Sequence, residues 1–485
     1  MTMKKRILII LAVLVLLLST AAAGMQYWFL QNHVELEGQY HPKDAPSLVL
    51  SGSELPAMDT LLQFSDLNTL DVRSIRLSIS QYEQLRHLLP KCEILWLVPF
   101  QGDYLPVDTQ ELTIGELSPA DFESIRYFPN LYTIHAEGCA DYVQLHALEN
   151  AFPHLDVRYT LPLNGTLYTN EDAARITRLE LQNADVTELS AMLSYFPQLQ
   201  EVAFAGTVPE NEQLYQLMCQ YPDISFQWDL TLFDITTSNT ATTLILSDIP
   251  MESTAEVESY LKYFPNLERV EMCNCGISSE EMDALSQRHP DIRFVWTIKV
   301  RFGTLRTDAI AFIPYKLGYH IGNPLYDSDC TELKYCTDLI CLDMGHMKIR
   351  DISFLEHMPN MKYLILGDTP VKDFTAIAGL KELIYLEIFN VQFTQHELLL
   401  GLSKLEDLNL GSTPTNDIAV LKQMTWLKRL WVPGTRLNGF QYDELVQSLP
   451  DTQVVIYARH STDKGWRDNQ NYRDMRDLLG MWYMQ

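Results

Sequence analysis

The hexapeptide Leu339-Ile340-Cys341-Leu342-Asp343-Met344 decides the fold, because its apolar pattern returns four more times at a constant spacing of 22 residues. Alternate residues of a short strand point to opposite faces, so the repeated apolar positions lie inward and the residues between them lie outward. A single 22-residue coil cannot bury its own apolar face, so the coils must stack to be stable. The inward positions form three columns: Leu339, Met361, Leu383, Leu405, Leu427; Leu342, Leu364, Leu386, Leu408, Leu430; and Met344, Leu366, Ile388, Leu410, Val432.

A turn and a returning apolar segment such as Phe354-Leu355 follow each expected strand. This L-x-x-L-x-L pattern resembles the 22-residue leucine-rich repeats of internalin-like bacterial surface proteins. The resemblance implies an α/β solenoid, a leucine-rich-repeat horseshoe with a parallel sheet on its concave face. The chain departs from the family where the family usually has an asparagine in the turn, so we expect looser turns; the residues there are Met347, Thr369, Val391, Thr413 and Thr435.

The N-terminal half repeats at a longer period. Phe128-Pro129, Phe196-Pro197 and Phe264-Pro265 recur every 68 residues, and an extended apolar segment follows Pro153, Pro222 and Pro290. Further strands are expected at Leu48, Leu112, Leu179 and Leu244, because apolar residues alternate there. We therefore expect one continuous curved solenoid over residues 48–456.

The chain from residue 48 onward is expected to have four parts. Residues 48–297 form irregular leucine-rich repeats with the 68-residue super-repeat, and residues 332–457 form the regular 22-residue repeats. Between them, residues 298–331 break both periods with several glycines and prolines and predict an irregular joint or an inserted loop. Residues 458–485 hold Trp466, Tyr472, Trp482 and Tyr483 and are expected to cap the open edge of the last coil.

The N-terminus predicts export. Lys4, Lys5 and Arg6 precede an uncharged, largely apolar stretch over residues 7–30, which as a helix spans about 36 Å and can cross a bilayer. The positive cluster keeps the N-terminus cytoplasmic, so residues 1–30 are expected to be a signal anchor, followed by a linker over residues 31–47 and an extracytoplasmic repeat domain. The alternative is a cleaved signal peptide, because Ala21-Ala22-Ala23 matches a cleavage site; the chain is then secreted.

Composition and motifs argue against several function classes. A formal net charge of −27 repels phosphate backbones, so nucleic acid is not an expected partner. The eight cysteines lack paired zinc-ligand spacing and are too dilute for a disulfide scaffold, so buried thiols are expected, with a disulfide within Cys330, Cys336 and Cys341 as the alternative. Nucleophile elbows, zinc-binding helices and phosphate-cradling glycine loops are absent from the sequence, so we expect no enzymatic activity, no metal and no cofactor.

The outward residues of the regular repeats predict a binding face. Exposed aromatic rings mixed with a few charges are typical of protein or glycan recognition, so we expect a non-enzymatic module that binds a protein, a peptide or a glycan. The alternatives are that the rings only stack across neighbouring coils, and that the chain is a structural spacer of the cell envelope. The expected ligand-binding residues are Tyr363, Ile365, Tyr385, Glu387, Phe389, Asp407, Asn409, Arg429 and Trp431.

Overall fold

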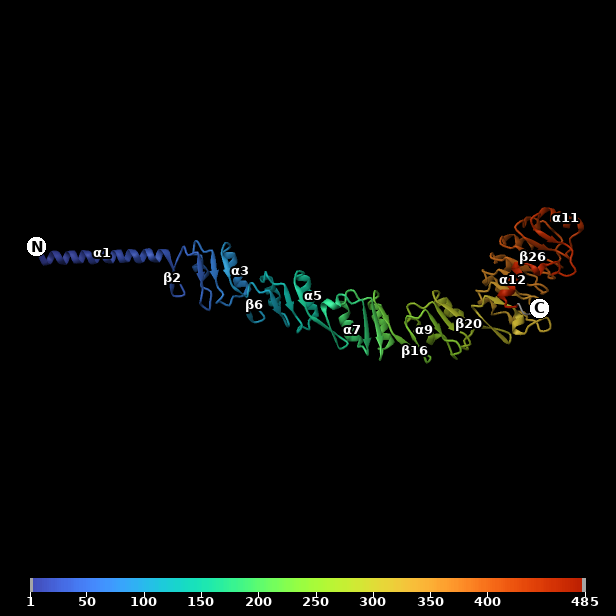
Figure 1. Ribbon diagram of the computed structural model, residues 1–485, viewed down its shortest axis with the longest axis horizontal. Coiled ribbons are helices and arrows are strands. Elements are labelled where there is room, and N and C mark those ends of the chain that lie inside the picture. The colour runs from blue at the N-terminus through green and yellow to red at the C-terminus, as the bar shows by residue number, and fades with distance from the viewer. Residues whose placement is uncertain (1–2, 482–485) are drawn as a thin grey trace. The chain divides into compact units, whose positions relative to one another are not determined.

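The computed structural model describes residues 3–481 and divides into two compact units (Figure 1). The first unit comprises Met1–Pro209 with Tyr221–Ser225, and the second Glu210–Gln220 with Phe226–Gln485. The chain begins with helix α1 (Met3–Asn32), of which Ile7–Asn32 is long and apolar enough to span a membrane. The apolar side chains of α1 are exposed, which is compatible with a membrane anchor or a signal sequence.

Short parallel strands in groups of three follow α1, and an antiparallel hairpin stands before and after each group. Helices connect strands within these groups, and the inward leucines of the strands are buried. The hairpins are β1–β2 (His33–Leu36, Gln39–Pro42), β6–β7 (Leu97–Phe100, Asp103–Pro106) and β11–β12 (Thr160–Leu163, Thr166–Thr169). The groups are β3 (Ser47–Val49), β4 (Thr69–Asp71), β5 (Glu93–Leu95); β8 (Glu111–Thr113), β9 (Thr133–His135), β10 (Asp156–Arg158); and β13 (Arg178–Gln182), β14 (Glu201–Ala205), β15 (Ser225–Gln227). The connecting helices are α2 (Met58–Leu61), α3 (Ile79–Leu88), α4 (Pro119–Ser124), α5 (Tyr142–Ala151), α7 (Val186–Met192) and α8 (Asn211–Gln220), with 3-10 turns η1 (Ile125–Tyr127) and η2 (Leu193–Tyr195). Helix α6 (Asn170–Ala173) leads from hairpin strand β12 into β13.

The second unit repeats this pattern once before it changes. Hairpin β16–β17 (Asp229–Leu232, Ile235–Ser238) precedes β18 (Thr243–Ile245), β19 (Arg269–Met272) and β20 (Arg293–Val300), with α9 (Ala255–Leu261) and α10 (Ser279–Arg288) between the strands. Strand β20 then turns back into β21 (Gly303–Arg306) as a fifth hairpin. All the strands expected around Leu48, Leu112, Leu179 and Leu244 are confirmed.

The hairpins correct three expectations. Residues 31–47, expected as a linker, contain β1–β2, and residues 298–331, expected as an irregular joint, begin inside hairpin β20–β21. The solenoid is present, but its parallel sheet is not continuous over residues 48–456 as expected, because a hairpin separates one group of parallel strands from the next. The cause is local: Gln101-Gly102 and Asn164-Gly165 hold left-handed φ at both turn positions, which is the geometry of a tight two-residue hairpin.

The regular 22-residue repeats form one seven-stranded parallel sheet. Leu342, Leu364, Leu386, Leu408 and Leu430 stand opposite one another in it, as the sequence predicts, and all are fully buried. The strands are β22 (Ala311–Phe312), β23 (Cys341–Asp343), β24 (Tyr363–Ile365), β25 (Tyr385–Glu387), β26 (Asp407–Asn409), β27 (Arg429–Trp431) and β28 (Gln453–Val455). The remaining elements are α11 (Gly439–Ser448), α12 (Gln470–Leu478) and the 3-10 turns η3 (Pro314–Leu317), η4 (Asp327–Asp329), η5 (Leu333–Tyr335), η6 (Ser353–His357), η7 (Thr375–Gly379), η8 (His396–Gly401), η9 (Leu421–Gln423) and η10 (Trp466–Asp468).

The turns of these repeats are regular despite the missing asparagine, so the expectation of looser turns is wrong. Each turn places one residue in the left-handed region, namely His346, Asp368, Asn390, Ser412 and Gly434. The amide of each of the first four donates to a carbonyl of the next coil at 2.8 to 2.9 Å. The threonine hydroxyls close the same turns from within, as Thr369 Oγ1 does by donating to the Leu366 carbonyl at 2.7 Å.

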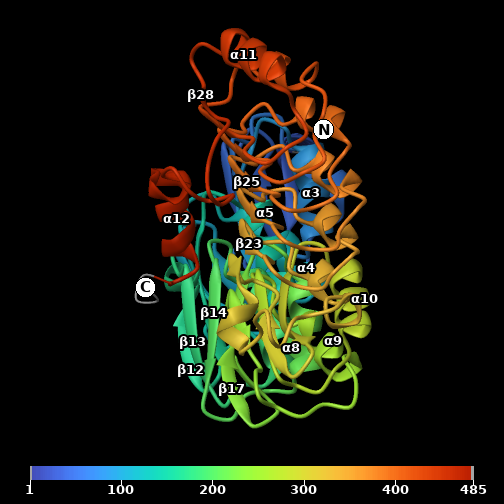
Figure 2. The ribbon, with the colours of Figure 1, turned by 90° about the vertical axis from the view of Figure 1, so that its right-hand side faces the viewer.

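The C-terminal segment lies elsewhere than expected. Residues 458–481, which we call the strap, cover the outward face of β23–β27 rather than only the edge of the last coil. Figure 2 shows α12 on one side of β23 and β25, with the 3-10 turns of the repeats on the other. The expected cap residues Trp482 and Tyr483 lie outside the described residues.

Candidate binding site

The sheet face carries all nine expected ligand-binding residues. Eight of them stand on β24–β27, and Phe389 lies in the turn after β25. The expectation of an exposed surface is wrong, because eight of the nine are buried and Arg429 is nearly so. Tyr385, Trp431 and Trp466 of the strap belong to one continuous buried cluster with Met475 and Leu479. The aromatic rings of the face therefore form a second core with the strap.

Glu387 is the polar centre of this contact. Its carboxylate is fully buried and accepts hydrogen bonds from Trp466 Nε1 at 2.7 Å and Arg467 at 2.8 Å. The Tyr385 hydroxyl donates to the same carboxylate. The Trp466 ring packs 5.2 Å from the Tyr385 ring and 5.0 Å from the Trp431 ring, centroid to centroid. Two rings and one carboxylate thus form a socket for the pair Trp466-Arg467, which we call the Glu387 socket.

A second group of polar contacts lies on β26 and β27. Asp407 accepts from Asn469 at 2.7 Å and from Asn471 at 2.8 Å. Arg429 donates through one terminal nitrogen to the Trp466 carbonyl at 2.7 Å, while its other terminal nitrogen is buried and has no hydrogen-bond partner among the described residues. Trp431 Nε1 donates to a strap carbonyl, that of Asp463, at 2.9 Å. The strap therefore satisfies most polar groups of the face, but not Arg429 completely.

Burial controls the titration of this face. Burial, and then the charge of Glu387, raise the pKa of the Tyr385 hydroxyl well above its ordinary value, so Tyr385 stays a hydrogen-bond donor. Burial alone lowers the pKa of Arg467, but the carboxylate of Glu387 outweighs it and the pKa rises overall. Burial lowers the pKa of Arg429, against the attraction of Asp407. Arg467 of the strap therefore stays cationic where it meets the face.

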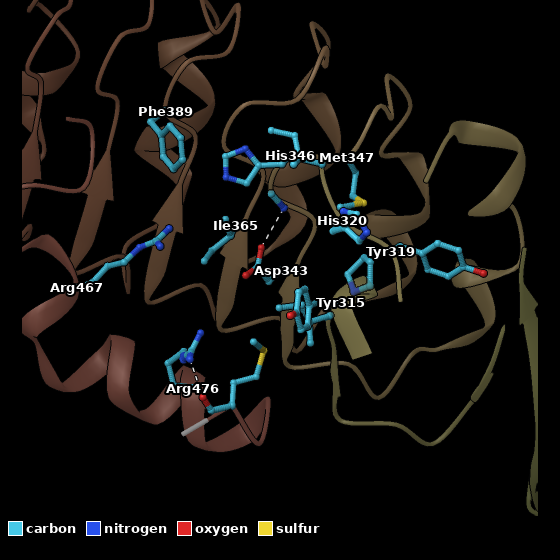
Figure 3. A pocket seen from close by; sticks show the side chains of 15 residues that line it. Tyr315, Tyr319, His320, Asp343, His346, Met347, Ile365, Phe389, Arg467 and Arg476 are labelled. Carbon is cyan, nitrogen blue, oxygen red and sulfur yellow. Dashed lines mark hydrogen bonds between the residues drawn. The ribbon is translucent and has the colours of Figure 1, made fainter. Parts of the chain in front are cut away.

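Part of the face remains open as a cavity of about 380 Å³ (Figure 3). Figure 3 shows Asp343 pointing into it, with Ile365, Phe389 and Arg467 to one side and Tyr315 and Arg476 below. Ile365 and Phe389 are the two expected ligand-binding residues that line this cavity. The remaining lining residues are Ile313, Pro314, Tyr319, His320, Ile321, Gly345, His346, Met347 and Met481.

Asp343 is the distinctive group of the cavity. Its Oδ1 accepts from the Gly345 amide at 2.9 Å, and no ion pair to it occurs within residues 3–481. Burial raises its pKa to about 6, and the nearby charge of Glu387 adds to this effect. An acid that forms no ion pair, in a cavity with apolar walls, can accept a hydrogen bond or pair with a positive charge of a ligand.

The described residues contain no group of three or more His, Cys, Asp or Glu side chains that could hold a metal ion. Cys330, Cys336 and Cys341 are buried free thiols, as are Cys139, Cys273 and Cys275, whereas Cys92 is half-buried and Cys219 exposed. Burial raises the pKa of Cys330 and of Cys336 to about 12, so these thiols stay protonated and unreactive. The prediction of buried thiols is therefore confirmed for the six buried cysteines, but not for Cys92 and Cys219.

Sequence reasoning missed the residues that the strap and the joint contribute. Trp466 and Arg467 reach the face from 79 and 80 residues beyond Glu387. Tyr315 and Arg476 line the cavity from segments expected as a joint and as an edge cap. The aromatic composition of the tail was the available signal, but nothing local says which surface an aromatic tail covers.

Comparisons with known proteins give structural matches only. No family model and no curated protein sequence matches the chain. An internalin from Listeria monocytogenes is similar at 14% identity over 87% of this chain and 91% of its own, with a TM-score of 0.26. A second internalin from that species shows 18% identity over 48% and 83%, TM-score 0.24, and a leucine-rich-repeat protein of Leptospira interrogans shows 14% over 85% and 96%, TM-score 0.18.

Likeness at this level says nothing about a ligand. The architecture stands on the chain's own geometry: a 22-residue period, strands in parallel register and inward leucine columns that are fully buried. By these features the chain has a leucine-rich-repeat fold.

Proposed function

We propose that the chain is a non-enzymatic binding protein that is exported, is held at the membrane by α1 and presents its 22-residue repeats to a protein, peptide or glycan partner. Lys4, Lys5 and Arg6 before the apolar helix support the orientation, with the repeats on the extracytoplasmic side. The net charge of −27 favours such partners over nucleic acid.

The observation that carries this proposal is the cavity beside the strap. Apolar walls with a few convergent polar groups are what binding sites commonly offer, and here Ile365 and Phe389 stand beside Asp343 and Arg476. Two exposed side chains, Tyr315 and Ile321, lie at its margin and would contact a bound partner first. A protein or peptide segment suits an opening of this kind better than a small cofactor, because about half of the lining comes from surface loops.

The test uses a random peptide library displayed on phage, panned against the chain from residue 33 onward. Peptides enriched on the wild type are expected to lose at least about tenfold in affinity for the Tyr315→Ala/Ile321→Ala variant, because the margin of the cavity is gone. Phe440→Ala is the control, since Phe440 is also an exposed apolar side chain but lies on α11, away from the residues that line the cavity. Enriched peptides that bind both variants equally, or no enrichment, would contradict a binding function at this cavity.

A structural spacer role is the second candidate, and the groups of three strands favour it. Their outward side chains are largely charged or polar, as with Asp71 on β4, Glu111 on β8 and Arg158 on β10. Such a face offers no aromatic patch to a partner. Failure of the panning experiment would leave this role as the better account of the chain.

A further inference from the structure

The strap meets the sheet face in the way a bound peptide would. We infer that the strap is an exchangeable occupant of the outward face of β23–β27, and that this face takes a partner segment carrying an aromatic residue followed by arginine. The inference rests on the proposed function, since it presumes a partner, but it concerns the covered part of the face rather than the open cavity.

The Glu387 socket defines what the face recognises. An indole N–H and a guanidinium bind the same buried carboxylate, at 2.7 Å and 2.8 Å, and the indole ring lies between Tyr385 and Trp431. A segment that carried the aromatic residue but not the arginine after it would leave one oxygen of the Glu387 carboxylate without its cationic partner. The socket therefore selects an aromatic residue and an arginine together, in that order along the segment.

Buried charge is costly in a permanent cover. Glu387 is fully removed from water beneath the strap, and an apolar side chain of the same volume often stabilises a buried contact as well as a charged one does. Asp407 lies under the strap in the same way, 1% exposed and bonded to two asparagine amides. A sheet face that is permanently covered does not need the buried carboxylates of Glu387 and Asp407. A face that selects a particular peptide sequence does need them, because they discriminate between peptides.

The strap also fits the face incompletely. One terminal nitrogen of Arg429 is buried without a hydrogen-bond partner among the described residues, and its approach to Asp407 is 3.8 Å. A buried donor without an acceptor destabilises the contact that buries it. A partner segment that places a carbonyl or carboxylate against this nitrogen would bind better than the strap does. Replacement of the strap by such a segment is therefore favourable.

The strap can open without disturbing the coils. Helix α12 itself buries only Met475, the other buried side chains of the strap are Trp466, Leu479 and Met481, and the strap adds no strand to the seven-stranded sheet. Its contacts are made by side chains and by a few carbonyls, so their loss leaves every hydrogen bond between the strands intact. Local opening of such a segment costs less than unfolding of the core beneath it.

The first test is amide hydrogen exchange on the unmodified full chain in detergent. The amides of α12 are expected to exchange at least about 100-fold faster than those of Leu386 and Leu408, which lie in the sheet. Exchange of α12 at the rate of the sheet would overturn the inference, because the strap would then open only when the whole module unfolds. No variant is needed, so misfolding cannot confuse the result.

The second test adds the ligand in trans. A fluorescent synthetic peptide of residues 459–481 is titrated into the full chain and into a Trp466→Ala/Arg467→Ala full chain, whose own strap is weakened. The peptide is expected to bind the variant about tenfold more tightly, because the competing strap occupies less of the face. A peptide with the same two substitutions is the control and is expected not to bind.

Equal binding of the two peptides, or no binding to either chain, would overturn the inference. These outcomes differ from a failure of the proposed function, which is judged by the margin of the cavity at Tyr315 and Ile321. If the strap exchanges but no phage peptide binds, the Glu387 socket is the only recognition site. If phage peptides bind but the strap does not exchange, the cavity is the only recognition site.

Discussion

At the scale of single residues, Glu387 and Asp343 show two different uses of an acid on one sheet face. Glu387 is fully buried, and its carboxylate accepts hydrogen bonds from an indole, a guanidinium and a phenol hydroxyl. Asp343 faces the cavity with one backbone amide as its hydrogen-bond donor. The first acid fixes structure, and the second is available to a ligand.

Replacement of Glu387 by alanine tests the first role. Glu387→Ala leaves the Trp466 indole N–H and the Tyr385 hydroxyl buried without an acceptor, so the free energy of unfolding of the regular repeats should fall by roughly 2 to 4 kcal/mol. Urea denaturation followed by near-ultraviolet circular dichroism measures it. Glu382→Ala is the matched control, because Glu382 forms an exposed pair with Lys404 and should change stability by less than about 1 kcal/mol. Equal effects of the two substitutions would argue against a buried socket.

The raised pKa of Asp343 predicts a pH-dependent effect of Asp343→Asn. The folded chain holds this proton up to about pH 6, while the unfolded chain releases it near 3.8, so the stability that protonated Asp343 contributes is complete below pH 3.8 and is lost as pH rises through 6. Asparagine removes the cost of burying the charge. The variant should therefore gain roughly 1 to 3 kcal/mol at pH 7.5 and almost nothing at pH 4, as measured by urea denaturation at both pH values. A gain that is the same at both pH values would show that the charge of Asp343 is not the cause.

At the scale of elements, the sequence predicts strands better than it predicts their grouping. Each leucine column is a local pattern, so the strand positions and the register of the seven-stranded sheet follow from spacing alone. The hairpins follow from dipeptides such as Asn164-Gly165, a signal that a search for leucine periods does not include. The covering of the face depends on contacts across 80 residues, which no local pattern encodes.

Hairpin β16–β17 offers a test of the turn argument. Its turn residues Phe233 and Asp234 hold left-handed φ of 50° and 63°, whereas hairpins β6–β7 and β11–β12 place glycine at the second position, at Gly102 and Gly165. Asp234→Gly should raise the free energy of unfolding by about 0.5 to 1 kcal/mol, because glycine adopts this φ without steric cost. The reverse substitution Gly165→Asp should lower it by a similar amount in thermal denaturation. Destabilisation by both substitutions would contradict a common turn geometry.

At the scale of the whole molecule, one apolar helix precedes two kinds of repeat with different surfaces. The outward residues of the groups of three strands are mostly polar, while those of β24–β27 include aromatic rings that need the strap. Only the second surface has the composition of a recognition site.

Membrane fractionation tests the role of α1. The full chain should stay in the membrane pellet after alkaline carbonate washing, and a chain beginning at His33 should be soluble, because Ile7–Asn32 holds the only span that is long and apolar enough among the described residues. N-terminal sequencing of the mature protein is the control. A mature chain that begins just after Ala23 would show a cleaved signal peptide instead of an anchor.

The account depends most directly on the position of the strap over the predicted binding face. A side chain built at Gly411 would place its Cβ 3.3 Å from Ser461 Cβ, close to the separation that a disulfide requires. The double variant Gly411→Cys/Ser461→Cys should therefore form this disulfide on oxidation, and peptide mass spectrometry should identify the linked pair. If both introduced thiols remain free to alkylation in the oxidised, folded protein, the strap does not lie on the face and the account is wrong.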